Sequence, residues 1–247
     1  METKTARAGL FSGNALKLMA ALSMTVDHIG VVFFPGVMWL RIIGRLAFPI
    51  FAFMIAEGCK YTRSRVRYFF MIFTLAAVCQ AVYWFAAGDT YLSVLVTFSL
   101  AILVIYALQF FKESLAQGRI FRTVAAGILL AAAVAVVWQL NRILEIDYGF
   151  WGCMLPVFAS LCRHRRGAPG KKFLPDRNPV HVACLSLGLL CLYQSLGGVQ
   201  IWSVLSIPLL LYYSGRRGKG NLKYFFYIFY PAHLAILQGL AWILTAK

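Results

Sequence analysis

Apolar segments separated by short breaks fill almost the whole of this 247-residue chain. One membrane-spanning helix needs roughly 20 apolar residues. Hydrophobic residues make up 61% of the chain and charged residues only 13%, against roughly 25% charged in soluble domains. We therefore predict an all-α, polytopic transmembrane bundle of about nine helices (range eight to ten) in a single membrane domain, 1–247. The nine segments are 13–35, 38–59, 67–87, 91–111, 121–140, 147–162, 180–196, 199–213 and 224–245.

Basic residues occupy alternate breaks between these segments. The other breaks hold little positive charge beyond Arg142, and Lys247 ends the chain. Lys and Arg favour the cytoplasmic side of a membrane, so the pattern predicts a cytoplasmic N-terminus and an outer C-terminus. The net charge of +16 then comes from the basic residues that set the orientation of the protein in the membrane, and no nucleic-acid partner is expected. The basic breaks hold Lys4 and Arg7; Lys60, Arg63, Arg65 and Arg67; Lys112, Arg119 and Arg122; Arg163, Arg165, Arg166, Lys171, Lys172 and Arg177; and Arg216, Arg217, Lys219 and Lys223.

Two segments, 180–196 and 199–213, are short for a full crossing. They form either two crossings or one re-entrant hairpin. Basic breaks flank the pair on both sides, so the predicted orientation is the same in either case.

Motifs for several common chemistries are missing from the sequence. It has no Walker loop, GxGxxG, GxSxG or HExxH pattern, which disfavours nucleotide hydrolysis, serine hydrolysis and zinc proteolysis. The six cysteines lie mostly within apolar runs and form no CxxC pair, so we interpret them as buried packing residues and expect no metal.

Ionisable residues inside the membrane are concentrated in the first two segments. Each charge at a helix centre costs about 2.5–3.5 kcal/mol, so it needs a partner or a function. At 1.5 Å per residue, His28 lies roughly 22 Å into the membrane, in its outer half. We expect Asp27 and His28 to meet Arg41 or Arg45 across the turn at Pro35. The full set is Lys17, Asp27, His28, Arg41, Arg45 and Glu57.

Two interpretations of this cluster are open. An Asp27 ion pair with Arg41 or Arg45 would lock a helical hairpin. However, one ion pair already neutralises the charge of Asp27. A purely structural pair would need neither a second arginine nor a titratable imidazole beside it. We therefore favour a functional site in which His28 is a proton acceptor that makes an amine or hydroxyl nucleophilic.

The last segment contains a second histidine, His233, in YFFYIFYPAHLAIL. Tyr230 lies three positions earlier on the same helix face, and Pro231 frees a backbone carbonyl that can line a cavity. A packing role and a functional role for His233 both stay open. Weaker candidates are Gln80, Tyr83, Asp147, Tyr148 and Gly149.

Four blocks of the sequence resemble a known family. They are SGNALKLMAALSMTVDHIGVVFFP, LRIIGRLAFPIFAFMIAEGCKYTRSR, DYGFWGCMLPVF and YFFYIFYPAHLAIL. In this order they are similar to the TraX family of membrane proteins, associated with N-terminal acetylation of conjugative pilin, within a wider superfamily of transmembrane acyltransferases. The sequence departs from the more polar family pattern at CQAVY and VTFSL. The resemblance implies a multi-pass protein of the bacterial cytoplasmic membrane.

The resemblance also implies roles for particular residues. His28 matches the superfamily's catalytic histidine of the first helix, with Asp27 beside it. Arg41 and Arg45 match the arginines after the first turn, and His233 matches the terminal Tyr-Pro-x-His block. Acyl-CoA is expected to enter from the cytoplasm, and the acceptor to lie on the far side.

We therefore expect an acetyltransferase that uses acetyl-CoA as donor. Asp27 would orient or charge-balance the imidazole, and Arg41 or Arg45 would steady the developing oxyanion. Basic residues at the cytoplasmic face would bind the CoA phosphates, unless they act only as orientation signals. Those candidates are Lys60, Arg63, Arg65 and Arg67, together with Lys17.

The acceptor is left open between an amine and a hydroxyl on a peptide, amino compound or glycan. Other partners are membrane lipid and, if the protein is not a monomer, a second copy in a homodimer. Two other functions stay open: a proton-coupled small-molecule transporter using Asp27, His28 and Arg45, and a non-enzymatic pilus or envelope assembly protein.

Overall fold

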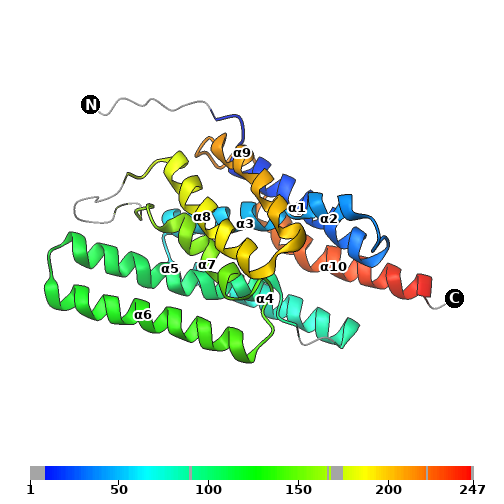
Figure 1. Ribbon diagram of the computed structural model, residues 1–247, viewed down its shortest axis with the longest axis horizontal. Helices are drawn as coiled ribbons and strands as arrows, with labels where there is room; N and C mark the ends of the chain where they lie inside the picture. Colours follow the sequence, from blue (N-terminus) through cyan, green and yellow to red (C-terminus); the bar gives the residue numbers. More distant parts are fainter. Residues whose placement is uncertain (1–8, 89–90, 166, 168–174, 221, 246–247) are drawn as a thin grey trace.

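The computed structural model is all-helical over the residues that it describes, which are 9–88, 91–165, 167, 175–220 and 222–245. Predictions that concern Lys4, Arg7, Arg166, Lys171, Lys172 and Lys247 lie outside these residues. The helices, shown in Figure 1, are α1 (Gly13–Val32), α2 (Met38–Gly44), α3 (Ala47–Tyr61), α4 (Arg65–Ala87), α5 (Val94–Ala116), α6 (Ile120–Ile143), α7 (Gly149–Ser160), α8 (Asn178–Leu196), the 3₁₀ helix η1 (Gly198–Leu205), α9 (Ser206–Leu211) and α10 (Lys223–Thr245).

Seven helical stretches among the described residues are long and apolar enough to cross a membrane, which makes this a multi-pass membrane protein. The predicted helical bundle is confirmed, whereas the number of crossings and the side of the N-terminus stay predictions. The seven stretches are Gly13–Val32, Met38–Tyr61, Arg65–Phe85, Val94–Ala116, Ile120–Ile143, Asn178–Leu196 and Tyr224–Ile243.

The two remaining apolar stretches are shorter. α7 has 12 residues, about 18 Å at 1.5 Å per residue, although we expected a segment over 147–162. Much of this short helix is buried by its neighbours. η1 and α9 form one stretch, Gly198–Leu211. Because a 3₁₀ helix rises further per residue than an α-helix, this stretch is longer than an α-helix with the same number of residues. Asn178 at the start of α8 donates to the carbonyl oxygens of Leu210 and Leu211 at the end of α9, so these two stretches form an antiparallel hairpin.

Contacts between loops show which helix ends lie on the same side of the bundle. At the basic end, residues 11–14 bond to residues 212–220, and Lys60 pairs with Asp176. There Lys112 also donates to carbonyl oxygens at the end of α7. At the opposite end, the α4–α5 loop bonds to the α6–α7 loop. All described basic breaks therefore share one end, as the alternation of charge predicted.

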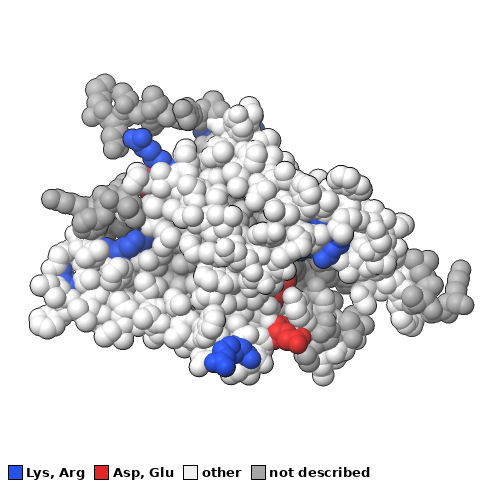
Figure 2. Space-filling model, in the orientation of Figure 1, with Lys and Arg blue, Asp and Glu red and all other residues white. Residues whose placement is uncertain are grey.

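The centre of the bundle is formed by Met38–Tyr61 and α5. In their apolar windows 72% and 67% of residues are buried, against 17% for α4 and 11% for α6. Most of the molecular face shown in Figure 2 is uncharged, with scattered charged groups. Helices α4 and α6 are therefore peripheral, and their apolar outer surfaces suit contact with lipid.

The second predicted segment, 38–59, is divided into α2 and α3, with the break at Arg45 and Leu46. Pro49 explains its position, because proline lacks the N–H that would bond the Arg45 carbonyl and its ring crowds that oxygen. The hydroxyl of Ser23 on α1 donates to the Ile43 carbonyl. The break therefore ties α1 to α2 and turns Arg45 toward α1.

Gly44 allows the close approach of α1 to this break. A Cβ on residue 44 would overlap the Asp27 side chain, which sits against the helix backbone there. We expect Gly44→Ala to destabilise the protein by about 1–3 kcal/mol, the usual cost of overpacking. Unfolding in detergent micelles measures this. Gly36→Ala is the control, because a Cβ there meets nothing within 4 Å. Equal stability of the two variants would contradict this account of the contact.

Candidate functional site

A cavity of about 380 Å³ lies toward the end of the bundle opposite the basic loops. We call it the histidine cavity. Its wall includes His28 and carries four charged side chains, although most of its other lining residues are apolar or aromatic. The charged residues are Asp27, Arg41, Arg45 and Asp147. The predicted meeting of Asp27 with Arg41 or Arg45 is confirmed, since Asp27 pairs with both.

Asp27 binds both arginines rather than one of them. Arg45 Nη2 donates to the two carboxylate oxygens at 2.9 and 2.8 Å, and Arg41 Nη1 donates to Oδ2 at 3.1 Å. Arg45 is 9% exposed and also reaches Gln200 Oε1 at 3.4 Å. The ion pairs join α1 to α2 and the α2–α3 break, while Gln200 adds η1 to the same network.

His28 hydrogen-bonds the second histidine. His28 Nδ1 lies 3.0 Å from His233 Nε2, and the rings stack with centroids 5.1 Å apart. His233 Nδ1 lies 3.0 Å from the Phe229 carbonyl oxygen. Because a carbonyl only accepts, this bond puts the proton of neutral His233 on Nδ1, and its Nε2 then accepts from His28 Nδ1–H. The lone pair of His28 is therefore on Nε2.

Asp27 and His28 thus have separate partners, so Asp27 does not orient the imidazole directly, and charge balance, the other role predicted for it, stays a prediction. The orienting bond of His28 comes from His233 on α10, 205 positions away in sequence. Asp27 contributes charge to the same cavity. The sequence had named both histidines but had not paired them.

The α6–α7 loop supplies a second carboxylate to the cavity, that of Asp147. Its neighbour Tyr148 has a left-handed backbone with φ of 61°, and the Tyr148 ring stacks on Phe48 with centroids 3.8 Å apart. Such a conformation is costly for a residue with a side chain and persists where surrounding contacts enforce it. Gly152 leaves the space that Tyr148 fills.

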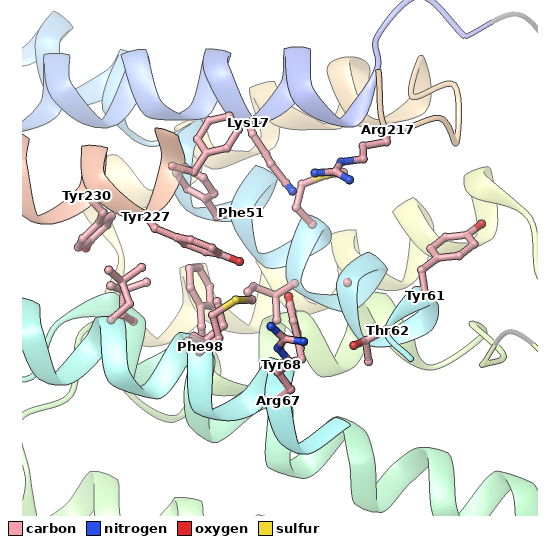
Figure 3. Close-up of a pocket in the computed structure, with 18 of the residues that line it drawn as sticks. Lys17, Phe51, Tyr61, Thr62, Arg67, Tyr68, Phe98, Arg217, Tyr227 and Tyr230 are labelled. Carbon is pink, nitrogen blue, oxygen red and sulfur yellow. The ribbon is translucent and has the colours of Figure 1, made fainter. Parts of the chain in front are cut away.

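A second cavity, of about 600 Å³, opens near the basic end and is called here the basic cavity. Figure 3 shows Lys17 and Arg217 projecting into it from one side and Arg67 from the other. Arg63 also lines its wall. Among the five predicted phosphate-binding residues, Lys17, Arg63 and Arg67 are therefore at this cavity.

The other two predicted phosphate-binding residues are engaged elsewhere. Lys60 Nζ pairs with Asp176 at 2.7 Å, and Arg65 Nη2 pairs with Glu113 at 2.9 Å. Glu57 forms a buried ion pair with Arg163. These pairs fasten the loops at the basic end.

The two cavities share part of their walls. Met24, Phe51, Phe98 and Tyr230 line both of them. Figure 3 labels three of these side chains, Phe51, Phe98 and Tyr230, within the basic cavity. A largely apolar partition of four side chains therefore separates a basic opening from the histidine cavity.

Sequence reasoning missed some residues of these cavities and ranked others low. Arg217 was treated only as an orientation signal and Gln200 was not noticed, since neither lies in a recognisable motif. The weaker candidates Tyr83, Asp147 and Tyr148 line the histidine cavity, whereas Gln80 bonds the α4–α5 loop. No group of three or more His, Cys, Asp or Glu able to hold a metal occurs among the described residues.

The fold and site define a class: multi-pass helical membrane proteins with a buried cavity lined by charged side chains. The profile of the TraX protein family matches residues 12–241. The chain belongs to the TraX family.

Two curated relatives are similar to this chain. A probable fimbrial assembly protein, FimC of serogroup H1, from Dichelobacter nodosus is 26% identical over 92% of this chain and 94% of its own length. An uncharacterized protein of Rickettsia prowazekii (strain Madrid E) is 25% identical over 61% of this chain and 56% of its own length. No solved structure shows a significant match.

Asp147 lies in a loop outside the long helices. Its pKa predicts how the stability of the protein changes with pH. Burial raises this pKa to about 6, despite the hydrogen bond from Tyr91. The unfolded value is about 3.9, so the folded protein holds this proton more tightly. The stabilisation by protonation is complete below pH about 4 and is lost as the pH rises through 6.

We therefore expect Asp147→Asn to be more stable than the native protein at pH 8, by up to about 2–3 kcal/mol. The difference should shrink as the pH falls toward 4. Unfolding in detergent micelles across this range measures it. Glu145→Gln, at an exposed carboxylate in the same loop, is the control and should show no such trend. A pH-independent difference for Asp147→Asn would contradict the prediction.

Proposed function

We propose that this protein transfers an acyl group, in the first instance acetyl, from acetyl-CoA to an amine or hydroxyl acceptor across the bacterial cytoplasmic membrane. The donor enters the basic cavity from the cytoplasm, and the acceptor reaches the histidine cavity from the outer side. This assignment has the N-terminus in the cytoplasm and the C-terminus on the outer side, in keeping with the distribution of basic residues.

One observation carries the proposal: the cavity that holds His28 adjoins the basic cavity through shared walls. A donor with phosphates at one end and a thioester at the other needs such an arrangement. The phosphates would bind Lys17, Arg63, Arg67 and Arg217, because guanidinium and ammonium groups suit phosphate oxygens. The apolar stretch between would take the linking arm, with the thioester beyond the partition.

His28 has the geometry of a general base. Its Nε2 lone pair would accept a proton from the acceptor's amine or hydroxyl, whose nitrogen or oxygen attacks the thioester carbon. The carbonyl oxygen becomes an oxyanion. Collapse of this intermediate breaks the C–S bond, and the departing CoA thiolate takes the proton back from His28.

Arg41 is the better placed arginine to face the oxyanion. It gives Asp27 one hydrogen bond, and its side chain is 29% exposed. Arg45 is more enclosed and is held by both carboxylate oxygens and by Gln200. We therefore assign Arg41 to oxyanion stabilisation and Arg45 to holding Asp27 and the α2–α3 break.

The acceptor is proposed to be a pilus component, with a pilin N-terminus as the leading choice. Membership of the TraX family supports this choice, as does similarity along nearly the whole chain to a protein named as a probable fimbrial assembly protein. Any such acceptor would approach from the outer end of the bundle.

A proton-coupled transporter is the second candidate. Two cavities that meet at a partition inside the bundle also suit a substrate pathway that opens alternately to each side. Release of free CoA thiol from acetyl-CoA in the presence of an acceptor separates the two, because transport releases none. A non-enzymatic assembly protein would also release none.

The first test is His28→Ala in purified, reconstituted protein. We expect acyl transfer to fall by about 10²–10⁴-fold, the usual contribution of a general base, with folding retained. The measurements are CoA thiol release and a +42 Da mass gain on the acceptor, the mass of an added acetyl group. His181→Ala is the control, because His181 pairs with Asp176 at the basic end, outside both cavities. Full activity of the His28 variant would overturn the assignment.

The second test concerns donor binding. Arg67→Gln removes a cation from the wall of the basic cavity and should raise the KM for acetyl-CoA about 10-fold, with kcat little changed. Arg119→Gln is the matched control, since Arg119 is exposed at the same end but lines neither cavity. Equal KM values for the two variants would show that these arginines act only as orientation signals.

A further inference from the structure

Asp147 differs from the other enclosed carboxylates of the described chain, because no described cation lies within ion-pair distance of it. Asp27, Glu57, Glu113 and Asp176 each pair with a lysine or an arginine. Glu145 is exposed and needs no partner. Removing a carboxylate from water costs free energy unless a cation pairs with it, so a functional reason is needed for keeping Asp147 at this position.

The chain holds Asp147 firmly in place. Its backbone N–H donates to the Leu92 carbonyl at 2.9 Å, and its own carbonyl accepts from Thr97 Oγ1 at 2.7 Å. The hydroxyl of Tyr91 donates to Oδ1 at 2.8 Å. Three bonds from the α4–α5 region therefore fix both the backbone and one carboxylate oxygen, and none of them comes from a cation. This is the arrangement of a preorganised binding group.

Asp147 also lies where an acceptor would enter. It lines the histidine cavity with His28 but does not line the basic cavity. It belongs to the α6–α7 loop, at the end of the bundle away from the proposed donor opening. An aromatic surface surrounds it, since Tyr91 and Tyr148 line the same cavity. A carboxylate framed by aromatic rings is a suitable site for an ammonium group.

Resting on the proposed function and its amine acceptor, we infer that Asp147 is the residue that selects this acceptor, because it binds the amine first as its ammonium ion. The ammonium of R–NH₃⁺ pairs with Asp147 at the mouth of the histidine cavity. It then gives one proton to His28 Nε2, and the neutral nitrogen attacks the thioester carbon. The C–N bond forms and the C–S bond breaks; the departing thiolate takes the second proton from the nitrogen, and His28 releases the first. The products are R–NH–CO–CH₃ and CoA-SH, with one proton released.

A role in charge balance alone makes a different prediction. Asp27, Arg41 and Arg45 together carry one excess positive charge, which Asp147 would neutralise at a distance. If that were its only role, removing the carboxylate would disturb every acceptor equally. Recognition of an ammonium group affects amines and spares hydroxyl acceptors, which carry no charge.

The experiment compares Asp147→Asn with native protein in proteoliposomes, using acetyl-CoA as donor. A short peptide with a free N-terminus is the amine acceptor, and the same peptide with a hydroxyl in place of its amino group is the neutral acceptor. We expect a 10- to 100-fold rise in the KM for the amine in the variant, the effect of losing a hydrogen bond to a charged group. The KM for acetyl-CoA and the weaker transfer to the hydroxyl acceptor should not change.

Glu145→Gln is the control, because it removes a carboxylate two residues away that is exposed to solvent. Its kinetics should match those of the native protein. An unchanged KM for the amine in Asp147→Asn, or equal losses with both acceptors, would overturn the inference. So would a native preference for the hydroxyl acceptor.

Failure of this inference is distinguishable from failure of the proposed function. If native protein releases no CoA thiol with either acceptor, the proposed acyl transfer itself is wrong. If native protein acetylates the amine and Asp147→Asn does so with the same KM, only the role of Asp147 is wrong. Asp147→Glu adds a check on folding, since it keeps the charge and should recover part of the affinity for the amine.

Discussion

The cost of placing charge inside a membrane governs the arrangement at the histidine cavity. Asp27 on α1 is stable there because two guanidinium groups bind it, and those groups come from α2 and from its junction with α3. The junction exists because Pro49 cannot continue the helical hydrogen bonding, and Gly44 leaves room for the acid. One ion-pair network therefore fixes the approach of the first two segments and sets the charge of the cavity.

The charged residues at the two ends of the bundle are arranged differently. Ion pairs at the basic end, such as Glu57 with Arg163 and Lys60 with Asp176, fasten loops. Arg63, Arg67 and Arg217 line the basic cavity together with Lys17. At the other end, Asp27 pairs with two arginines, whereas Asp147 has no ion-pair partner among the described residues. Between the ends, a largely apolar partition separates a basic opening from a polar cavity, as the proposed transfer across the membrane requires.

Local sequence signals predicted the helices well, because a span must be apolar and of a fixed length. These signals predicted the helix bounds less well where a segment is surrounded by other helices instead of by lipid. α7 is shorter than expected and much of it is buried by its neighbours, and the segment 38–59 is divided in two although its hydropathy is continuous. Asp27, His28 and the two arginines were found as a cluster because charge is so rare in these segments. Arg217 and Gln200 were not found, since a basic or amide side chain near a helix end is unremarkable in sequence.

The sequence alone determined the helical membrane fold, the gathering of basic loops at one end and the concentration of charge in the first two segments. These depend on hydropathy and spacing, which each segment carries by itself. Tertiary structure alone decided the pairing of His28 with His233, the shared wall between the two cavities and the position of Asp147 beside the histidine cavity. Those features join residues that are far apart in the chain, and only the packing of helices brings their side chains within a few ångströms of one another.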